Sequence, residues 1–503
     1  MNVSINNIKN CTKLANDEIR NLKNKLHIKN ISSINNKKEL CSIIKKKYQS
    51  LCPCNLKLDK DTKLTLKKHQ LSVANHLVNN RGAIVVHSVG TGKTLSAIST
   101  SQCLLLNNIV KKIIVITPTS LKDNFIKQMK IYNDNINFDN YYFYTIQGIV
   151  NILENNSKVV NSSDALIIID EAHNLRTING SRFNIIFNYV KKAEKILLLT
   201  ATPMINYKHD IINLVSLINF EKPISIEYFN NLLLKENLSK LKNYIKNIFS
   251  FYGKGKEDPN FPTKKIIEIY LEMDEKYMKL YNNIENGEAS KVPDFNGKNL
   301  QVFYNGVRRA SNIIDSKSPK IEWILEKIND HPNAKFVIFS HFINMGIKPI
   351  MEKLDKLNIN YEHITGDLPG NKRGEAVNNY NSNKIKILFI SKAGSEGLDL
   401  KNTTYIIIME SGWNENSIEQ IIGRGVRYKS HENLSESKKH VTIYKLFSVK
   451  PYEYKHITKI TNNYLLEFKN NILSVDLYLR NFSWIKQQEI TSFYKILQKL
   501  KFN

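Results

Sequence analysis

Long hydrophobic runs are missing from this sequence of 503 residues, although 42% of its residues are hydrophobic. No stretch reaches the roughly 18 consecutive apolar residues that a membrane-spanning helix needs. The first seven residues also lack the apolar core of a secretory signal. The sequence therefore predicts an intracellular protein without a membrane segment, with enough apolar residues for packed cores.

Cysteine is scarce too, with five residues in the whole chain. Reduced, partly buried thiols are the first expectation for a protein of the reducing cytosol. Four of the five fall in the first part of the sequence, namely Cys11, Cys41, Cys52 and Cys54. These four could close a small zinc site, but their spacing matches no common zinc pattern.

Acidic residues are few relative to basic ones, with 46 Asp and Glu against 73 Lys and Arg and a formal net charge of +27. This excess predicts a polyanionic partner, most simply nucleic acid. Lysine, asparagine and isoleucine are all over-used, however, as an AT-rich coding sequence would produce without selection for binding, so the charge by itself is only moderate support. Arginine is scarce against this lysine background, and its planar fork suits phosphate better than lysine does. The informative arginines are Arg308, Arg309, Arg373, Arg424 and Arg427.

The segment from residue 83 to residue 98 is the most informative in the chain. Ala83–Val86 is predicted to be a buried parallel strand, and a helical pattern opens after Thr94. The residues between them match a phosphate-binding loop, in which backbone N–H groups and a helix N-terminus favour an anion. Lys93 would neutralise the β- and γ-phosphates, and the Thr94 hydroxyl suits Mg²⁺. The predicted loop comprises His87, Ser88, Val89, Gly90, Thr91, Gly92, Lys93 and Thr94, with His87 replacing the usual first glycine.

A pair of carboxylates follows a second predicted buried strand. The apolar residues 165–169 lead directly into Asp170 and Glu171. Asp170 could hold Mg²⁺ directly or through water, and Glu171 could orient and deprotonate an attacking water. A lone acidic pair would more simply be a turn after a core strand. Together with the loop around Lys93, the pair predicts a phosphoryl-transfer site.

Short β-branched runs alternate with helical patterns in two parts of the chain, which predicts two open parallel α/β sheets. The predicted blocks are a helical N-terminal extension (1–60), a first α/β lobe (61–222), a helical insertion (223–312), a second α/β lobe (313–450) and a helical C-terminal extension (451–503). The predicted strands are Ala83–Val86, Ile113–Thr117, Tyr141–Tyr144, Ala165–Asp170, Ile196–Thr200, Lys335–Ser340, Ile385–Ile390, Tyr405–Met409 and Val441–Phe447. Residues 22–47 faintly resemble a SAP domain, although a plain pair of helices is the simpler interpretation.

The ends of the predicted strands carry small hydroxyl residues and arginines. In the first lobe, residues 117–121 and 200–203 place hydroxyls and N–H groups at the carboxyl edge of the sheet, where ligands bind in such folds. In the second lobe, Arg424 and Arg427 are three residues apart and share a face if their segment is helical. An arginine brought to the γ-phosphate from another lobe would stabilise the charge that builds in phosphoryl transfer.

Taken in order, these motifs resemble those of superfamily 2 helicases, nearest the Swi/Snf-type branch, over residues 62–450. The motif residues are 66–70, Gly90–Thr94, 117–119, Asp170–His173, 200–203, Gly394–Leu400 and Gln420–Arg427. Residues 318–321, 408–414 and 430–431 are further similar to the nucleoside triphosphatase I and early-transcription-factor small-subunit proteins of large cytoplasmic DNA viruses. Two departures stand out: His87 in the phosphate loop, and Asp399 where many relatives have asparagine.

The resemblance implies an α/β fold of two RecA-like lobes in tandem, with ATP and Mg²⁺ as cofactors. It implies that Gln70 contacts the adenine, that Lys93 and Thr94 hold phosphate and Mg²⁺, and that His173 couples the lobes. Asp170 would bind Mg²⁺ and Glu171 would be the general base. Gln420, Arg424 and Arg427 would line the γ-phosphate, with Arg427 as the arginine finger. The implied nucleic-acid backbone contacts are Thr119, Thr145, Ser340 and Gly394.

The resemblance further implies a nucleic-acid-dependent ATPase that translocates on DNA in viral transcription, in the virion and the host cytoplasm. DNA is the first expectation for its track and RNA the alternative, and an RNA polymerase or transcription-factor subunit is the expected partner. Two other functions remain open. One is a transcription-factor subunit that uses ATP as a switch while it binds promoter DNA, and the other is a strand-separating helicase.

Overall fold

The computed structural model describes residues 41, 66–133, 136–155, 157–178, 180–253, 260–289, 300–366, 368–392 and 398–502. The chain forms two compact units, residues 1–254 with 492–503 and residues 255–491. The predictions for residues 1–60 lie outside the described residues except at Cys41. Those for Gly394 lie outside them too.

The first unit is built on a six-stranded parallel sheet with the order β3-β2-β4-β5-β1-β6. Every residue of β1, β4 and β5 is buried, as expected for strands covered on both faces. The strands are β1 (Gly82–His87), β2 (Lys112–Ile116), β3 (Tyr141–Tyr144), β4 (Ala165–Ile169), β5 (Lys195–Thr200) and β6 (Phe249–Tyr252).

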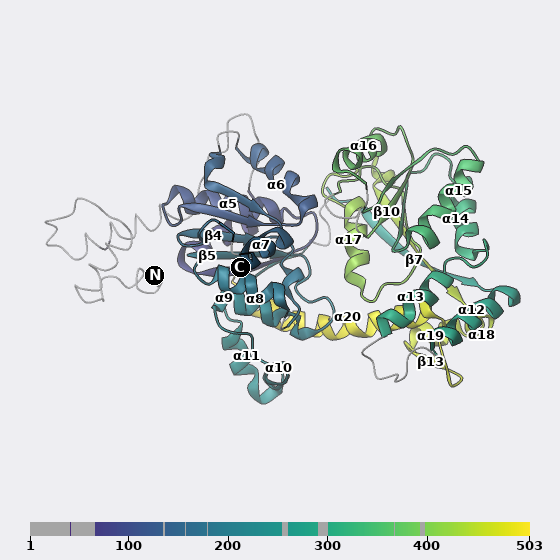
Figure 1. Ribbon diagram of the computed structural model, residues 1–503. Coiled ribbons are helices and arrows are strands. Elements are labelled where there is room, and N and C mark those ends of the chain that lie inside the picture. Colours follow the sequence, from purple (N-terminus) through teal and green to yellow (C-terminus); the bar gives the residue numbers. More distant parts are fainter. Residues whose placement is uncertain are drawn as a thin grey trace. The chain divides into compact units, whose positions relative to one another are not determined.

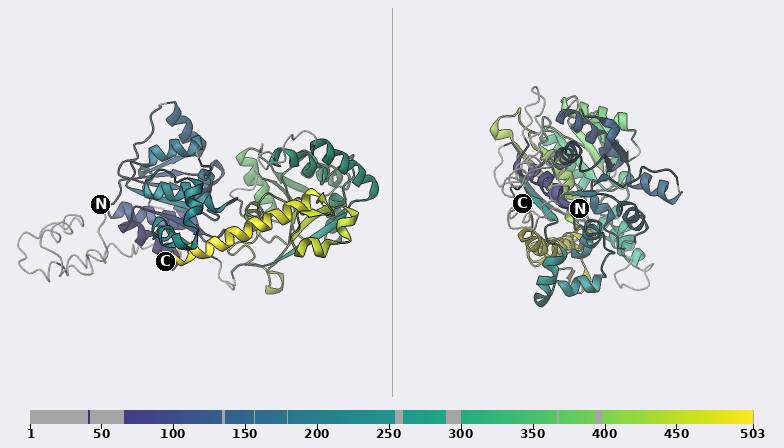
Figure 2. Two further views of the ribbon diagram at one scale, coloured as in Figure 1. Left: turned by 90° about the horizontal axis from the view of Figure 1, so that it is seen from below. Right: turned by 90° about the vertical axis from the view of Figure 1, so that its left-hand side faces the viewer.

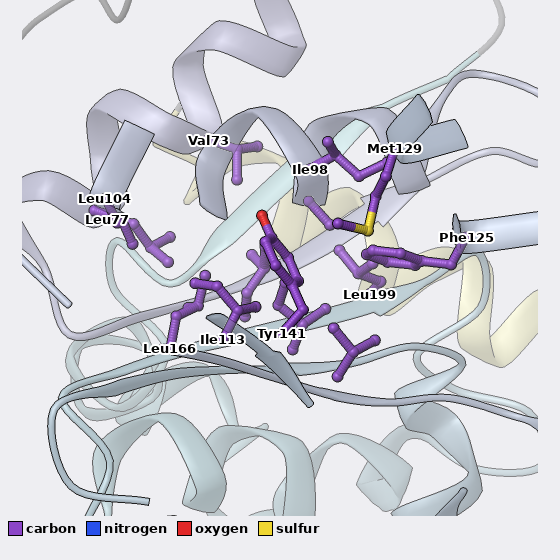
Figure 3. Packing of buried hydrophobic residues seen from close by; sticks show 14 of the residues in the cluster. Val73, Leu77, Ile98, Leu104, Ile113, Phe125, Met129, Tyr141, Leu166 and Leu199 are labelled. Atoms are coloured by element: carbon purple, nitrogen blue, oxygen red, sulfur yellow. The ribbon is translucent and has the colours of Figure 1, made fainter. Parts of the chain in front are cut away.

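Helices cover both faces of this sheet (Figure 1). One face packs against α4, α5 and α6 through a cluster in which Val73, Ile98 and Phe125 meet strand residues such as Leu199 (Figure 3). In Figure 1, α8 and α9 lie on the opposite side of the sheet. The helices are α4 (Lys68–Asn79), α5 (Lys93–Leu106), α6 (Thr119–Tyr132), α7 (Ile146–Glu154), α8 (Ser181–Val190), α9 (Ile212–Asn219), α10 (Ile226–Leu232) and α11 (Leu238–Tyr244).

The second unit contains another six-stranded parallel sheet, with the order β7-β12-β11-β8-β10-β9. Alternate strand residues face two separate cores, one with α16 and α17 and the other with α14 and α15. The strands are β7 (Thr263–Glu272), β8 (Phe336–Ser340), β9 (Tyr361–Ile364), β10 (Ile387–Ser391), β11 (Tyr405–Ile408) and β12 (His440–Val449).

The second unit contains further helices and the first part of α20, the longest helix, which Figure 2 draws in yellow as one uninterrupted helix. A short hairpin precedes α20. These elements are α12 (Glu275–Ala289), α13 (Leu300–Ala310), α14 (Pro319–Asp330), α15 (Lys348–Lys356), α16 (Gly370–Asn381), α17 (Glu415–Gly425), α18 (Pro451–Tyr454), α19 (Ile457–Asn462), β13 (Glu467–Phe468), β14 (Asn471–Ile472) and α20 (Val475–Lys499).

The last residues of the chain pack in the first unit. Phe493 lies edge-on to Phe229, with ring centroids 5.9 Å apart, and the backbone N–H of Phe502 donates to the Phe249 carbonyl at 3.0 Å. The Phe502 ring also stacks on His76 with a centroid distance of 3.6 Å. The first unit therefore combines two stretches of chain that are far apart in the sequence.

Two parallel α/β sheets in tandem confirm the predicted fold class. The helical prediction for residues 223–312 is wrong in two places, because β6 and β7 lie in this range and extend the two sheets. The division between the two units also falls within it, at residue 254. A further strand, β9, has no counterpart among the predicted strands.

The cysteines also differ from expectation. Cys41 and Cys103 are both disulfide-bonded, so the prediction of reduced thiols is wrong for these two, while Cys11, Cys52 and Cys54 lie outside the described residues. No group of three or more His, Cys, Asp or Glu among the described residues could hold a metal ion. Over the same part of the chain, no helix combines the length and apolarity that crossing a membrane requires.

Candidate functional site

The predicted phosphate loop follows β1 and ends where α5 begins at Lys93. Gly90 and Gly92 both have positive φ, 79° and 86°, a conformation that glycine adopts without steric cost. The Thr91 hydroxyl closes the loop by donating to the Ser88 carbonyl at 2.7 Å. Lys93 Nζ donates to the His87 carbonyl at 3.1 Å, so its ammonium group lies over the loop. Thr94 follows as the second residue of α5 and is half-buried.

The first turn of α4 supports the loop from outside. Gln70 Nε2 donates to the Gly92 carbonyl at 3.4 Å, and Gln70 Oε1 accepts from the Lys67 N–H at 2.8 Å. His69 Nε2 lies 3.2 Å from the Thr91 carbonyl and must donate there, because a carbonyl oxygen can only accept. A Cβ atom on Gly92 would lie 2.5 Å from Gln70 Nε2, so a side chain here would displace the Gln70 amide as well as strain the backbone at its positive φ.

His87 is the last residue of β1, and its side chain is fully buried. Its Nε2 lies 2.9 Å from Ser250 Oγ on β6, and its ring meets the His69 ring edge-on at 5.0 Å. Burial, followed by the nearby His69 and Lys93 charges, lowers the pKa of His87 to about 3. The side chain is therefore a neutral core residue, and the phosphate loop itself starts at Ser88.

Asp170 and Glu171 stand at the carboxyl end of β4. Asp170 is buried, and burial together with the neighbouring Glu171 carboxylate raises its pKa, while Lys93 opposes the rise. Glu171 has a φ of 49°, an uncommon angle for a residue with a side chain. Its Oε2 lies 3.3 Å from His173 Nδ1, and the same Nδ1 lies 3.2 Å from Thr200 Oγ1 at the end of β5. The strained backbone at Glu171 thus orients its carboxylate toward His173, which in turn contacts Thr200 on the next strand.

The donor groups of this edge fit a nucleotide with Mg²⁺. The loop offers backbone N–H groups and a helix N-terminus to phosphate. Oxygen ligands are what Mg²⁺ prefers, and the Thr94 hydroxyl and the Asp170 carboxylate are of that kind. The sequence-predicted residues of the first lobe therefore lie at the carboxyl edge of one parallel sheet.

Two predicted nucleic-acid residues also follow strands of this sheet. Thr119 is exposed at the first position of α6, three residues beyond β2. Thr145 directly follows β3, and its hydroxyl accepts from the Gly148 N–H at 2.9 Å, so it caps α7. Both residues lie at the carboxyl edge that carries the phosphate loop.

In the second unit, Gln420 and Arg424 lie four residues apart on α17 and so on one face of that helix. The condition under which Arg424 and Arg427 would share a helical face is not met, because α17 ends at Gly425. Arg427 follows the helix, where its Nη1 donates to the Leu398 carbonyl at 2.7 Å and lies 3.7 Å from Asp399 Oδ1. Asp399, noted as a departure from the family pattern, is therefore a partner of the predicted finger.

Ser340, the last residue of β8, is fully buried. Its hydroxyl donates to Glu410 Oε1 at 2.9 Å, which directs it into the unit rather than toward the surface. A side-chain contact from Ser340 to nucleic acid therefore has no support in this geometry.

Sequence reasoning missed several residues that shape the site. His69 stacks on Tyr252 of β6 with a centroid distance of 3.5 Å, and Ser430 donates from its hydroxyl to the Gly425 carbonyl at 3.1 Å, at the end of α17. The position of His69 beside Gln70 was the available signal for the first. For Ser430 the sequence carried no signal beyond its place in the motif that resembles the viral proteins.

Comparison with known proteins identifies two family models along the chain. The SNF2-related domain matches residues 67–334, and the helicase conserved C-terminal domain matches residues 319–429. A protein of Acanthamoeba polyphaga mimivirus, named provisionally as an ATP-dependent RNA helicase, is 36% identical over 425 residues, covering 78% of this chain and 92% of the relative.

Two more distant viral relatives match a larger share of this chain. Nucleoside triphosphatase I of Choristoneura biennis entomopoxvirus is 24% identical, covering 87% of this chain and 79% of the relative. The early transcription factor 70 kDa subunit of monkeypox virus is also 24% identical, covering 87% of this chain and 80% of the relative.

Proposed function

The chain belongs to the SNF2-related family of helicase-like ATPases and is a nucleoside-triphosphate hydrolase, and we propose that nucleic acid stimulates its hydrolysis and that it moves along DNA. The observation that carries this proposal is the meeting of Lys93, Asp170 and Glu171 at one edge of the first sheet. This is the set that phosphoryl transfer to water requires.

Each residue has a proposed task in the reaction. Lys93 and the loop N–H groups bind the triphosphate, and Gln70 lies where it can join adenine binding to the loop. Thr94 and Asp170 would hold Mg²⁺, which neutralises phosphate charge when bound. Glu171 orients the attacking water and accepts its proton, with His173 fixing the carboxylate. We assign to Arg427, with Gln420 and Arg424, the stabilisation of charge on the γ-phosphate.

Transcription is the process that the relatives' names support. Two of them are named as a nucleoside triphosphatase and an early transcription factor subunit of poxviruses, which supports a role in viral transcription. We further propose that the protein acts in the virion or host cytoplasm beside an RNA polymerase. The net charge of +27 supports a nucleic-acid track. We propose DNA, with contacts from Thr119 and Thr145 to its backbone, and RNA as the alternative.

An ATPase assay with duplex DNA, single-stranded DNA and RNA in turn tests the proposal. We expect DNA to raise the rate, Lys93→Ala to abolish it, and Glu171→Gln to lower it by about 10²–10⁴-fold while ATP still binds. Glu154→Gln, an exposed carboxylate at the end of α7, is the matched control and should hydrolyse normally. Normal hydrolysis by Lys93→Ala or Glu171→Gln would show that the site is wrongly assigned.

Two further assays separate movement from the other functions. A translocase displaces a third strand from duplex DNA without separating the duplex, whereas a helicase releases one of its strands. ATP binding that changes DNA affinity without turnover would instead indicate a nucleotide switch.

A further inference from the structure

Lys320, in the Ser318–Ile321 motif before the second sheet, has no role in the function proposed above. It is the second residue of α14 and is fully buried. Its Nζ lies 2.7 Å from Asp476 Oδ2, 3.1 Å from Asn312 Oδ1 and 3.4 Å from Ser311 Oγ. Because an ammonium group has three N–H donors, each of them has one acceptor.

A second buried acid adjoins this cluster. Glu410 follows β11, and its Oε1 accepts from the Ser340 hydroxyl at 2.9 Å and from the His341 N–H at 2.5 Å. Its Oε2 accepts from Asn312 Nδ2 at 3.4 Å, so Asn312 bridges Glu410 to Lys320. Burial alone would raise the pKa of Glu410, but the His341 side chain, whose Nδ1 lies 3.5 Å from Glu410 Oε1, and the Lys320 and Arg308 charges lower it to about 2.

Arg308 completes a group of two cations and two anions, here called the buried quartet: Arg308, Lys320, Glu410 and Asp476. All four are at most 5% exposed. Arg308 Nη2 donates to the Ser411 carbonyl at 3.0 Å, and the Ser411 hydroxyl donates to the Asp476 carbonyl at 2.9 Å. The quartet therefore holds Ser411 from both sides.

The turn that the quartet holds leads directly into the arginine helix. Glu410 and Ser411 lie in residues 409–414, the turn that connects β11 to α17; this helix carries Gln420 and Arg424 and is followed by Arg427. Buried ion pairs are often no more stabilising than apolar residues of similar size, so their value lies in fixing one geometry. Here the geometry fixed is that of the β11–α17 turn.

We propose that Lys320 is a positioning residue for hydrolysis, which acts through the buried quartet on the β11–α17 turn and hence on the placement of the arginines. This inference rests on the proposed role of Arg427 in turnover. It requires that loss of the quartet lower kcat and leave the KM for ATP unchanged, because the nucleotide-binding loop lies in the other unit.

The test replaces the ion pair as a unit. Lys320→Met alone would leave Asp476 buried without its cation, so the variant is the double replacement Lys320→Met with Asp476→Asn. It removes both charges, and an amide oxygen at residue 476 can still accept from the buried Ser448 N–H, which Asp476 Oδ2 accepts at 2.9 Å. We expect a kcat at least about tenfold lower, with KM within twofold and a Tm near that of the unmodified protein. The matched control is Lys450→Met with Glu285→Gln, which removes another largely buried pair, of 2.7 Å, in the same unit, and neither residue belongs to the quartet.

A milder variant covers the case in which the double replacement does not fold. Ser411→Ala removes only the hydroxyl that donates to the Asp476 carbonyl, and it should also lower kcat at constant KM. A folded variant of either kind with normal kcat overturns the inference, as does an equal loss in the Lys450 control. If Arg427→Ala also has a normal kcat, the proposed role of the arginines in hydrolysis fails. If Arg427→Ala lowers kcat but the double replacement at Lys320 and Asp476 does not, only the role of the quartet is removed.

Discussion

At the scale of single residues, the nucleotide edge depends on backbone conformation as much as on side chains. Glu171 has a φ of 49° and Gly92 has a φ of 86°. The Gly92 carbonyl also accepts a hydrogen bond from Gln70 Nε2. A residue with a side chain at Gly92 would be strained and would also displace Gln70. The chemistry of the edge is therefore sensitive to changes that remove no functional group.

Lys93, Asp170 and Glu171 could be predicted because each follows a continuous apolar run that ends at the same edge of a parallel sheet. The side-chain direction of His87 could not, because the loop pattern does not reveal where β1 ends. Arg427 was found by its motif, whereas its position beyond α17 was left open, because a helix over this segment was only a condition of the sequence prediction.

Arg427→Ala is the first prediction at this scale. Loss of the guanidinium should lower kcat by about 10³–10⁵-fold, because the variant would lack the charge that an arginine finger places on the γ-phosphate in the transition state, while ATP affinity changes little. Single-turnover hydrolysis and a binding titration measure the two quantities separately. Arg182→Ala, at an exposed position on α8, is the control. An unchanged rate with weakened ATP binding would remove the finger role from Arg427.

The second residue-scale prediction concerns His87 and acid. Its pKa is about 3 in the folded protein and near 6.5 when unfolded, so between these values the unfolded chain binds a proton that the folded one does not. The free energy of unfolding should therefore fall on acidification, by about 1.4 kcal/mol per pH unit for this group. His76, with a pKa of about 4, should add a similar loss.

Urea denaturation of His87→Gln and the unmodified protein between pH 5.5 and 4.5 measures this contribution. Because His76 titrates in both proteins, the difference in slope reports His87 alone. The variant should lose stability less steeply on acidification. Parallel profiles would mean that His87 is protonated in the folded protein.

At the scale of elements, the three strands of the two six-stranded sheets that the sequence did not reveal share one property. β6, β7 and β9 are edge strands, each paired on one side only within its six-stranded sheet. Edge strands are partly exposed, so they lack the continuous apolar run that marks a central parallel strand. β7 shows this most clearly, with Lys264, Lys265 and Glu268 among its residues.

The end of α17 carries the element-scale prediction. The Ser430 hydroxyl donates to the Gly425 carbonyl at 3.1 Å and accepts from the Arg427 N–H at 3.3 Å, so it closes the helix and holds the backbone of the proposed finger. Ser430→Ala should lower the free energy of unfolding by about 1 kcal/mol and reduce kcat. Denaturant titration and ATPase assays measure both effects.

Ser382→Ala is the matched control for this variant, since its hydroxyl donates to the Asn379 carbonyl at 3.3 Å at the exposed end of α16. It should leave kcat unchanged. Equal losses in kcat for the two variants would contradict a specific role for Ser430 in holding Arg427.

At the scale of the whole molecule, the net charge of +27 predicts salt-sensitive binding to nucleic acid. If about five phosphates are neutralised, affinity should fall roughly 500-fold between 50 and 200 mM salt, because binding releases condensed counterions. Fluorescence anisotropy with labelled duplex DNA at a series of salt concentrations measures the slope. A flat dependence would show that the charge reflects composition alone.

The first unit takes its last segment, residues 492–503, from beyond the entire second unit. On the ribosome, residues up to 254 emerge first, yet the partners of Phe229, Phe249 and His76 are not made until the second unit has been translated. At typical elongation rates this delay is roughly 10–50 s. During that interval the nascent nucleotide-binding half exposes an unfinished apolar surface, which makes it a natural client for chaperones.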